Sequence, residues 1–194
     1  MMQPVILLII LLLLAFGPML FEAQLAAHHD RALRAAGAVE PKDDVFPWMQ
    51  VVYPAAFVAM AVEAYYRPHG ADALVVAGIC VFVLAKGIKY WAIATLGPRW
   101  TFRVLVPPRS TRVTGGPYRF MRHPNYLGVI GELAGFALMA HAAFAGVASV
   151  RVFGWLIARR IGVEERALRI RARGTHGDHA DRSSSPDDPP LLGS

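Results

Sequence analysis

The sequence predicts an all-α protein: a polytopic membrane helix bundle with about five transmembrane helices, of which the last two form a helical hairpin. Hydrophobic residues make up 55% of the 194 residues and charged residues only 18%. Soluble domains have roughly 45–50% apolar and about 25% charged residues, so the composition favours a membrane protein. Apolar runs long enough to cross a hydrocarbon core of about 30 Å also recur along the chain.

The first predicted span covers residues 5–21. Val5–Leu14 is apolar throughout, and no charged residue follows until Glu22. At 1.5 Å per residue, about 17 helical residues cross most of the hydrocarbon core. A cleaved signal peptide is the alternative, but no Lys or Arg precedes this run, whereas a signal peptide has a basic start. We therefore expect a retained span.

The second and third predicted spans cover residues 46–66 and 73–96. Aromatic residues lie at the ends of the second run, where they anchor helices at the membrane interface: Trp48, Tyr65 and Tyr66. The third run is interrupted late by two lysines, Lys86 and Lys89.

The last long apolar stretch, Asn125–Ala158, predicts two helices. As one helix its roughly 34 residues would be about 51 Å long, too long for one crossing even when tilted. Arginines flank the stretch on both sides. A hairpin with spans 125–141 and 144–160 places both flanks on the same side of the membrane, which a single span cannot do.

A basic loop sets the predicted orientation. Gly97–His123 contains six arginines, no acidic residue and several Pro and Gly residues. Positive loops face the cytoplasm, so we expect residues 97–124 and the C-terminus there and the N-terminus outside, in the inner (plasma) membrane of a bacterium. Residues 1–174 form the predicted transmembrane domain, and residues 175–194, rich in Ser, Asp and Pro, form a disordered tail.

The charge and cysteine content exclude several functions. The formal charge is +6, but the arginines flank apolar segments, which indicates membrane orientation and no nucleic-acid partner. The single cysteine, Cys80, cannot form an internal disulfide, and no Cys/His cluster has zinc spacing, so no metal is expected.

The most specific string is Gly116–Gly128, which reads Gly-Pro-Tyr-Arg-Phe-Met-Arg-His-Pro-Asn-Tyr-Leu-Gly. Pro124 suits the first position of a helix, which places His123 at the cap. The free N–H groups of that first turn, beside arginines, predict a site for an anionic group such as a carboxylate. Tyr118 and Tyr126 offer flat faces and hydroxyls for a base and a ribose. The alternative is an interfacial cluster that only holds the helix end at the headgroups.

The second string is Arg159–Leu168, which contains Glu164 and Glu165. Arg160 and Glu164 are four residues apart, so they share one face of a continuous helix at the membrane exit. A solvated helix end with salt bridges is the alternative.

Together the two strings resemble the isoprenylcysteine carboxyl methyltransferase family of integral membrane methyltransferases, which is related to the phospholipid methyltransferases. The resemblance covers roughly Trp91–Leu168 and departs after it, where family members continue with tyrosine-bearing segments. It implies that S-adenosylmethionine binds on the cytoplasmic side, between the loop at 97–124 and the last helices. The cofactor contacts it implies are Ser110, Thr111, Arg112, Val113, Tyr118, His123, Pro124, Asn125, Tyr126 and Glu164.

The resemblance also implies roles in catalysis. Arg160 falls where the family places an arginine that handles the acceptor, and Arg103 is a further candidate for lining the cofactor. Alignment of the acceptor with the sulfonium methyl can supply roughly 7–11 kcal/mol. A carboxylate acceptor needs no general base, whereas a phenol does, and His123 is the candidate base.

The acceptor is left open between a prenylated protein carboxylate, a lipidic phenol and a phospholipid amine. In every case the substrate is lipophilic and the bilayer is a partner. Two rivals belong to other classes: an NADPH-dependent reductase of the sterol-reductase type, which NADPH oxidation would reveal, and a non-enzymatic membrane protein. The chain has no Gly-x-Gly-x-x-Gly string for the first and no internal repeats for the second.

Ionisable residues at membrane depth carry no assigned role: Glu63, Lys86, Lys89, Glu132 and Arg151. Such residues are costly in lipid and usually face the interior or a cavity. Glu132 either lines an acceptor tunnel or forms a structural pair with Lys86 or Lys89.

Overall fold

The computed structural model is a bundle of α-helices, and it describes residues 2–40, 45–67, 70, 72–105 and 113–182. Five α-helices and no strand are found in those ranges: α1 (Met2–Ala35), α2 (Phe46–Tyr66), α3 (Ala73–Leu96), α4 (Pro124–Met139) and α5 (Ala143–Arg182). Two short 3-10 turns, η1 (Gly97–Arg99) and η2 (Gly116–Arg119), follow α3 and precede α4. The predicted all-α fold is confirmed.

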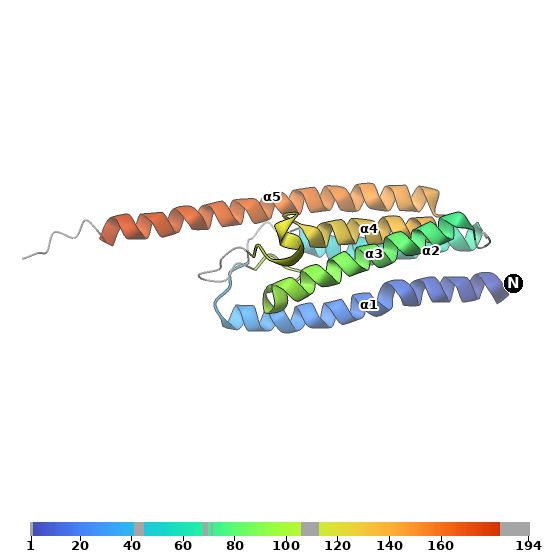
Figure 1. Cartoon of the computed structure of the whole chain (residues 1–194), viewed down its shortest axis with the longest axis horizontal. Coiled ribbons are helices and arrows are strands. Elements are labelled where there is room, and N and C mark those ends of the chain that lie inside the picture. The colour runs from blue at the N-terminus through green and yellow to red at the C-terminus, as the bar shows by residue number, and fades with distance from the viewer. Residues whose placement is uncertain (1, 41–44, 68–69, 71, 106–112, 183–194) are drawn as a thin grey trace, which may run out of the picture.

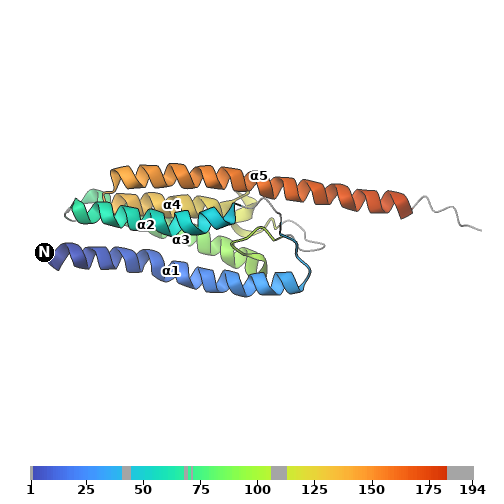
Figure 2. The same ribbon diagram turned by 180° about the vertical axis from the view of Figure 1, so that it is seen from behind.

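The helices run side by side along the long axis of the molecule (Figures 1 and 2). The N-terminus, the end of α2, the start of α3 and the α4–α5 turn lie at one end of the bundle. The end of α1, the start of α2, the end of α3 and the start of α4 lie at the other, where α5 continues beyond its neighbours. We call this second end the site end.

Local signals in the sequence determine where the helices begin and end. The Asp72 carboxylate caps α3 by accepting the N–H groups of Leu74 at 2.9 Å and Val75 at 3.0 Å. Gly97 ends α3 with a φ of 54°, a value that glycine adopts without strain. The turn between α4 and α5 falls at residues 140–142, so the predicted helical hairpin is present.

Two helices extend further than the sequence indicated. The expected span at 5–21 continues as α1 to Ala35, so the polar stretch after Glu22 is largely helical. Helix α5 continues to Arg182, past the expected start of the disordered tail at residue 175, and residues 183–194 lie outside the described residues. Extending an existing helix is easier than starting one, since each added residue fixes fewer dihedral angles per hydrogen bond.

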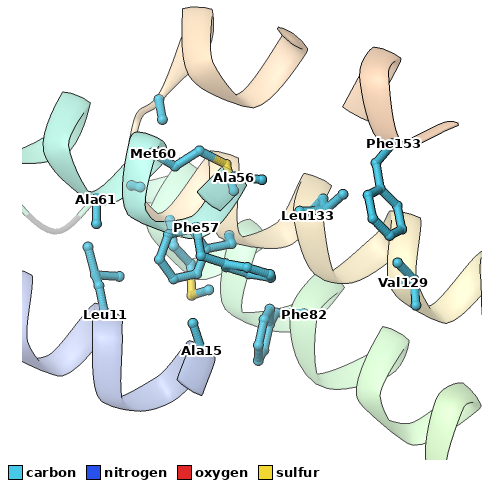
Figure 3. Packing of buried hydrophobic residues seen from close by; sticks show 14 of the residues in the cluster. Leu11, Ala15, Ala56, Phe57, Met60, Ala61, Phe82, Val129, Leu133 and Phe153 are labelled. Carbon is cyan, nitrogen blue, oxygen red and sulfur yellow. The ribbon is translucent and has the colours of Figure 1, made fainter. Parts of the chain in front are cut away.

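The core is apolar and lies between α1, α2, α3, α4 and α5. Figure 3 shows part of this core, to which α2 contributes Phe57 and Met60, α3 contributes Phe82 and α4 contributes Leu133, and all four are buried. Helices α3 and α4 approach closely because glycine faces backbone: a Cβ on Gly135 would lie 2.5 Å from the amide nitrogen of Phe82.

The outside of the bundle is also apolar. Large hydrophobic side chains are exposed on α1, α2, α3 and α5, among them Leu13, Val51, Leu84 and Trp155. Two helical stretches, Leu8–Ala35 and Ala73–Arg99, are long and apolar enough to cross a membrane, and most of each stretch is not buried in the bundle. This differs from the core helix of a soluble protein, which is covered by its neighbours, and indicates a membrane protein.

Three of the deep ionisable residues, Lys86, Lys89 and Glu132, form a buried ion-pair cluster with Glu22. Lys86 Nζ lies 2.9 Å from Glu22 Oε1 and 2.8 Å from Glu132 Oε2. Lys89 Nζ lies 2.5 Å from Glu22 Oε2 and 3.2 Å from Glu132 Oε1. The Tyr53 hydroxyl donates to Glu132 Oε2 at 2.6 Å. Glu132 was expected either to line an acceptor tunnel or to form a structural ion pair. In the structure it forms the ion pair, and it does so with both Lys86 and Lys89.

Candidate functional site

The two sequence strings meet at the site end of the bundle. Helix α4 begins there with Pro124, and α5 passes beside it at residues 160–164 (Figure 1). The Tyr126 hydroxyl of α4 donates a hydrogen bond to Glu164 Oε1 of α5. His123 Nδ1 lies 3.5 Å from Glu164 Oε2. The start of α4 and the acidic pair of α5 are therefore neighbours in space.

Glu164 is the centre of this site. Besides Tyr126 and His123, Arg160 contacts it through Nε at 3.4 Å from Oε1, as the four-residue spacing on one helix predicts. The Glu164 side chain is 24% exposed, so it is reachable from outside the bundle while held by three side chains. A partly open carboxylate with such neighbours suits the binding of a cationic or hydroxyl-bearing ligand.

The helix start orders the groups around Glu164. His123 is the residue before α4, and its ring stacks on Tyr126 with centroids 5.4 Å apart and planes at 16°. Pro124 is buried at the first helical position, where its missing N–H costs nothing. The first turn offers fewer donors to an anion than expected, because the N–H of Tyr126 already donates to the His123 carbonyl.

Arg160 is almost fully enclosed, with an exposed fraction of 4%. Its Nη2 donates to the Phe102 carbonyl, and its Nη1 lies 3.8 Å from Met49 Sδ. The guanidinium also lies 6.0 Å from the centre of the Phe46 ring. The sequence did not indicate Phe46, Met49 or Phe102, since nothing local in the chain relates α2 and the segment after α3 to α5.

The remaining predicted contacts fall into two groups. Tyr118 lies in η2, and burial, with the nearby charge of Glu164, raises the pKa of its phenol to about 12. Asn125 follows Pro124, and its buried Oδ1 has no hydrogen-bond partner within the described ranges. Val113 is half-buried. Three predicted contacts lie outside the described residues: Ser110, Thr111 and Arg112.

Arg103, a further candidate for lining the cofactor, contacts acidic residues in the structure. Its guanidinium lies 3.5 Å from Asp30 and 2.8 Å from Glu40, and it stacks 4.7 Å from the centre of the Phe46 ring. Although burial of Glu40 raises its pKa, hydrogen bonds from Arg34 and Arg103 bring the net pKa below its ordinary value. Arg103 therefore ties the segment after α3 to the end of α1.

The chain is similar in sequence to several known proteins. Residues 76–170 match the model of the isoprenylcysteine carboxyl methyltransferase (ICMT) family. The chain is 26% identical over 148 residues to the uncharacterized protein YpbQ of Bacillus subtilis, an alignment that covers 76% of this chain and 88% of the relative. It is 24% identical over 149 residues to an uncharacterized protein of Haemophilus influenzae, covering 76% and 87%. No solved structure matches the chain.

Proposed function

We propose that this chain, whose residues 76–170 match the isoprenylcysteine carboxyl methyltransferase family, is an integral membrane methyltransferase that uses S-adenosylmethionine and methylates a lipophilic acceptor. The observation that carries the proposal is the meeting of the α4 start with Glu164 of α5 at one end of the bundle. Two segments separated by most of a helical hairpin thus form one polar site at the end of the bundle.

The residues present fit the cofactor. S-adenosylmethionine carries a cationic amino group, a ribose and a base, and it supplies an electrophilic sulfonium methyl when bound. The partly open carboxylate of Glu164 can accept from an amino group or a ribose hydroxyl. The unpartnered Asn125 Oδ1 is a second acceptor at the same helix start. The rings of Tyr118 and Tyr126 offer flat surfaces.

The wider cofactor set is proposed by family membership. It comprises Ser110, Thr111, Arg112, Val113, Tyr118, His123, Pro124, Asn125, Tyr126 and Glu164. Arg112 would neutralise the cofactor's carboxylate, because a guanidinium binds such groups through two hydrogen bonds.

Arg160 and His123 are the proposed groups on the acceptor side. The guanidinium of Arg160 is held by the Phe102 carbonyl and Glu164 against the apolar Phe46 and Met49. A cation fixed among apolar groups suits an acceptor with an anionic head and a hydrocarbon tail. A carboxylate acceptor would need only this positioning, whereas a phenol would lose its proton to His123.

The proposed membrane arrangement is five crossings, with the N-terminus outside and the site end in the cytoplasm of a bacterial cell. The described parts of the basic loop, residues 97–105 and 113–123, and the end of α5 lie at the site end (Figure 2). Arginines prefer the cytoplasmic side, which supports this orientation. The cofactor would thus come from the cytosol and the acceptor from the bilayer.

The test of the reaction is transfer of radiolabelled methyl groups in membranes that contain the protein. Label in a base-labile lipid or protein ester supports a carboxylate acceptor, label in a phenol ether supports His123 as the base, and label in a phospholipid headgroup indicates N-methylation. Oxidation of NADPH without any methyl transfer would instead support a reductase and contradict the proposal.

The test of the site is titration of the purified protein with S-adenosylmethionine. Glu164→Gln keeps the shape and removes the charge, and since hydrogen bonds to charged groups contribute about 1.5–3 kcal/mol, we expect binding to weaken about 10- to 150-fold. Glu165→Gln is the matched control, because the neighbouring Glu165 is exposed and its replacement should leave affinity unchanged. Equal affinity of the Glu164→Gln variant and the unmodified protein would remove Glu164 from the cofactor site.

A further inference from the structure

An apolar groove runs between α4 and α5 near the turn that joins them, away from the site end. It has a volume of about 390 Å³, within the roughly 300–1,000 Å³ of small-molecule sites. Its lining includes Ala134, Ala137, Leu138, Gly146 and Val147, which are small or aliphatic. The groove can therefore hold a flexible hydrocarbon chain.

One charged residue, Arg151, stands among these apolar lining residues. Its side chain is exposed, and within the described ranges it has no ion pair or hydrogen bond. Arg151 lies eight residues into α5, about 12 Å from the helix start. This inference rests on the membrane crossing proposed above. In that arrangement the α-carbon of Arg151 lies well inside the hydrocarbon region, where an arginine needs an anionic partner.

The groove is separate from the methyl-transfer site. Arg151 and Arg160 are nine residues apart on α5, which at 3.6 residues per turn places them on opposite faces of the helix. Arg160 faces Phe46 and Met49 of α2, whereas Arg151 borders the groove against α4. A ligand of the groove is therefore not the acceptor bound at Arg160.

We infer that this groove binds one membrane phospholipid, with an acyl chain along the apolar lining and the phosphate on Arg151. Helical side chains lean towards the N-terminus of their helix, and a long arginine side chain extends further to reach the interface. For Arg151 that direction is towards the α4–α5 turn, the end of the bundle opposite the cofactor. The guanidinium thus reaches the phosphate of a lipid in the outer leaflet, and an anionic headgroup adds to the attraction.

The experiment is native mass spectrometry of the full chain in mild detergent, titrated with palmitoyl-oleoyl phosphatidylglycerol or, separately, with the phosphatidylcholine of the same chains. We expect one phospholipid molecule per chain to bind with the highest affinity. We also expect phosphatidylglycerol to bind more tightly than phosphatidylcholine. Arg151→Gln should weaken phosphatidylglycerol binding about tenfold or more and abolish the preference. Val147→Trp should block the groove and weaken both lipids while Arg151 is intact.

Arg31→Gln is the matched control, since Arg31 is an exposed arginine on α1 and its loss should leave lipid binding unchanged. Equal binding by the Arg151→Gln variant, the Val147→Trp variant and the unmodified chain would overturn the lipid site. If the unmodified chain is a dimer that dissociates in the Arg151→Gln variant without loss of lipid, the groove binds a second copy of the chain, and the lipid site is overturned. Release of the chain from membranes by alkaline carbonate would instead contradict the proposed topology, whatever the cofactor titration shows.

Discussion

The buried ion-pair cluster makes a strong prediction about stability. It places two lysines and two glutamates together, and the side chains of Glu22, Lys89 and Glu132 are at most 2% exposed. Its formal charge is zero, so Lys89→Met leaves two carboxylates facing the single ammonium of Lys86. Breaking a buried ion pair by removing one partner costs about 3–5 kcal/mol, because the remaining charge is buried and uncompensated.

That cost corresponds to a large change in the unfolding temperature. For chains of 150–250 residues, 1 kcal/mol lowers the midpoint by roughly 2–4 °C, so we expect Lys89→Met to lower it by about 6–20 °C. The assay is intrinsic fluorescence during heating of the protein in detergent. The magnitude comes from charge imbalance rather than from lost volume, since methionine is nearly as long as lysine and is itself apolar.

The double variant Lys89→Met, Glu22→Gln separates charge from packing. It restores neutrality, with Lys86 facing Glu132, and we expect it to recover most of the lost stability, which is a favourable coupling in a double-mutant cycle. If the stability losses of the two single variants add without coupling, or if Lys89→Met changes the midpoint by less than about 2 °C, the four residues do not act as an ion-pair network.

Three further predictions concern local features. The phenol of Tyr118 should titrate near pH 12, which absorbance at 295 nm will measure. Because its pKa in the folded state lies above the ordinary value of 10.0, its contribution to stability is complete below pH 10 and is lost as the pH rises through 12. Gly135→Ala places a Cβ 2.5 Å from the Phe82 nitrogen and should destabilise the α3–α4 pair by about 1–3 kcal/mol in thermal unfolding. Asp72→Ala removes the cap of α3 and should speed hydrogen exchange of the Val75 amide.

Each of these has a matched control in the chain. Tyr118→Phe should delete the component of the absorbance change centred near pH 12 and no other. Gly87→Ala adds a Cβ to α3 where nothing lies within 4 Å, so it should be neutral or slightly stabilising, and a loss equal to that of Gly135→Ala would contradict the steric explanation. Asp72→Asn should cap nearly as well as Asp72, so exchange as fast as in Asp72→Ala would mean that the cap does not protect the amide.

Local signals in the sequence were sufficient for most of the fold. The bounds of α2 and α3 were predicted from apolar runs, and the hairpin from the length of the last run. The Asp72 cap and Gly97, which delimit α3 in the structure, are local signals that this prediction did not use. The end of α1 could not be predicted this way, because Glu22 resembles the edge of a span. Its charge is matched by Lys86 and Lys89, more than 60 residues away, and such pairing leaves no local trace.

The same distinction applies to the site. The sequence predicted that the His123–Tyr126 segment and Glu164 serve one pocket, and the structure brings them into contact. The surroundings of Arg160 were not predicted, because Met49 is 111 residues away in sequence and Phe102 contributes a backbone carbonyl, which every residue has. The partners of Arg103 were not predicted either, because its acidic partners, Asp30 and Glu40, lie on and after α1, far away in the sequence.

The match to the family model begins at residue 76, yet α1 belongs to the same physical unit. Glu22 supplies half of the negative charge in the buried ion-pair cluster, so a bundle without α1 would bury two lysines against Glu132 alone. Nearer the site, the Arg103 contacts with Asp30 and Glu40 hold the segment whose Phe102 carbonyl accepts from Arg160. Helix α1 thus stabilises both the middle of the bundle and the acceptor side of the proposed site, although the family match does not include it.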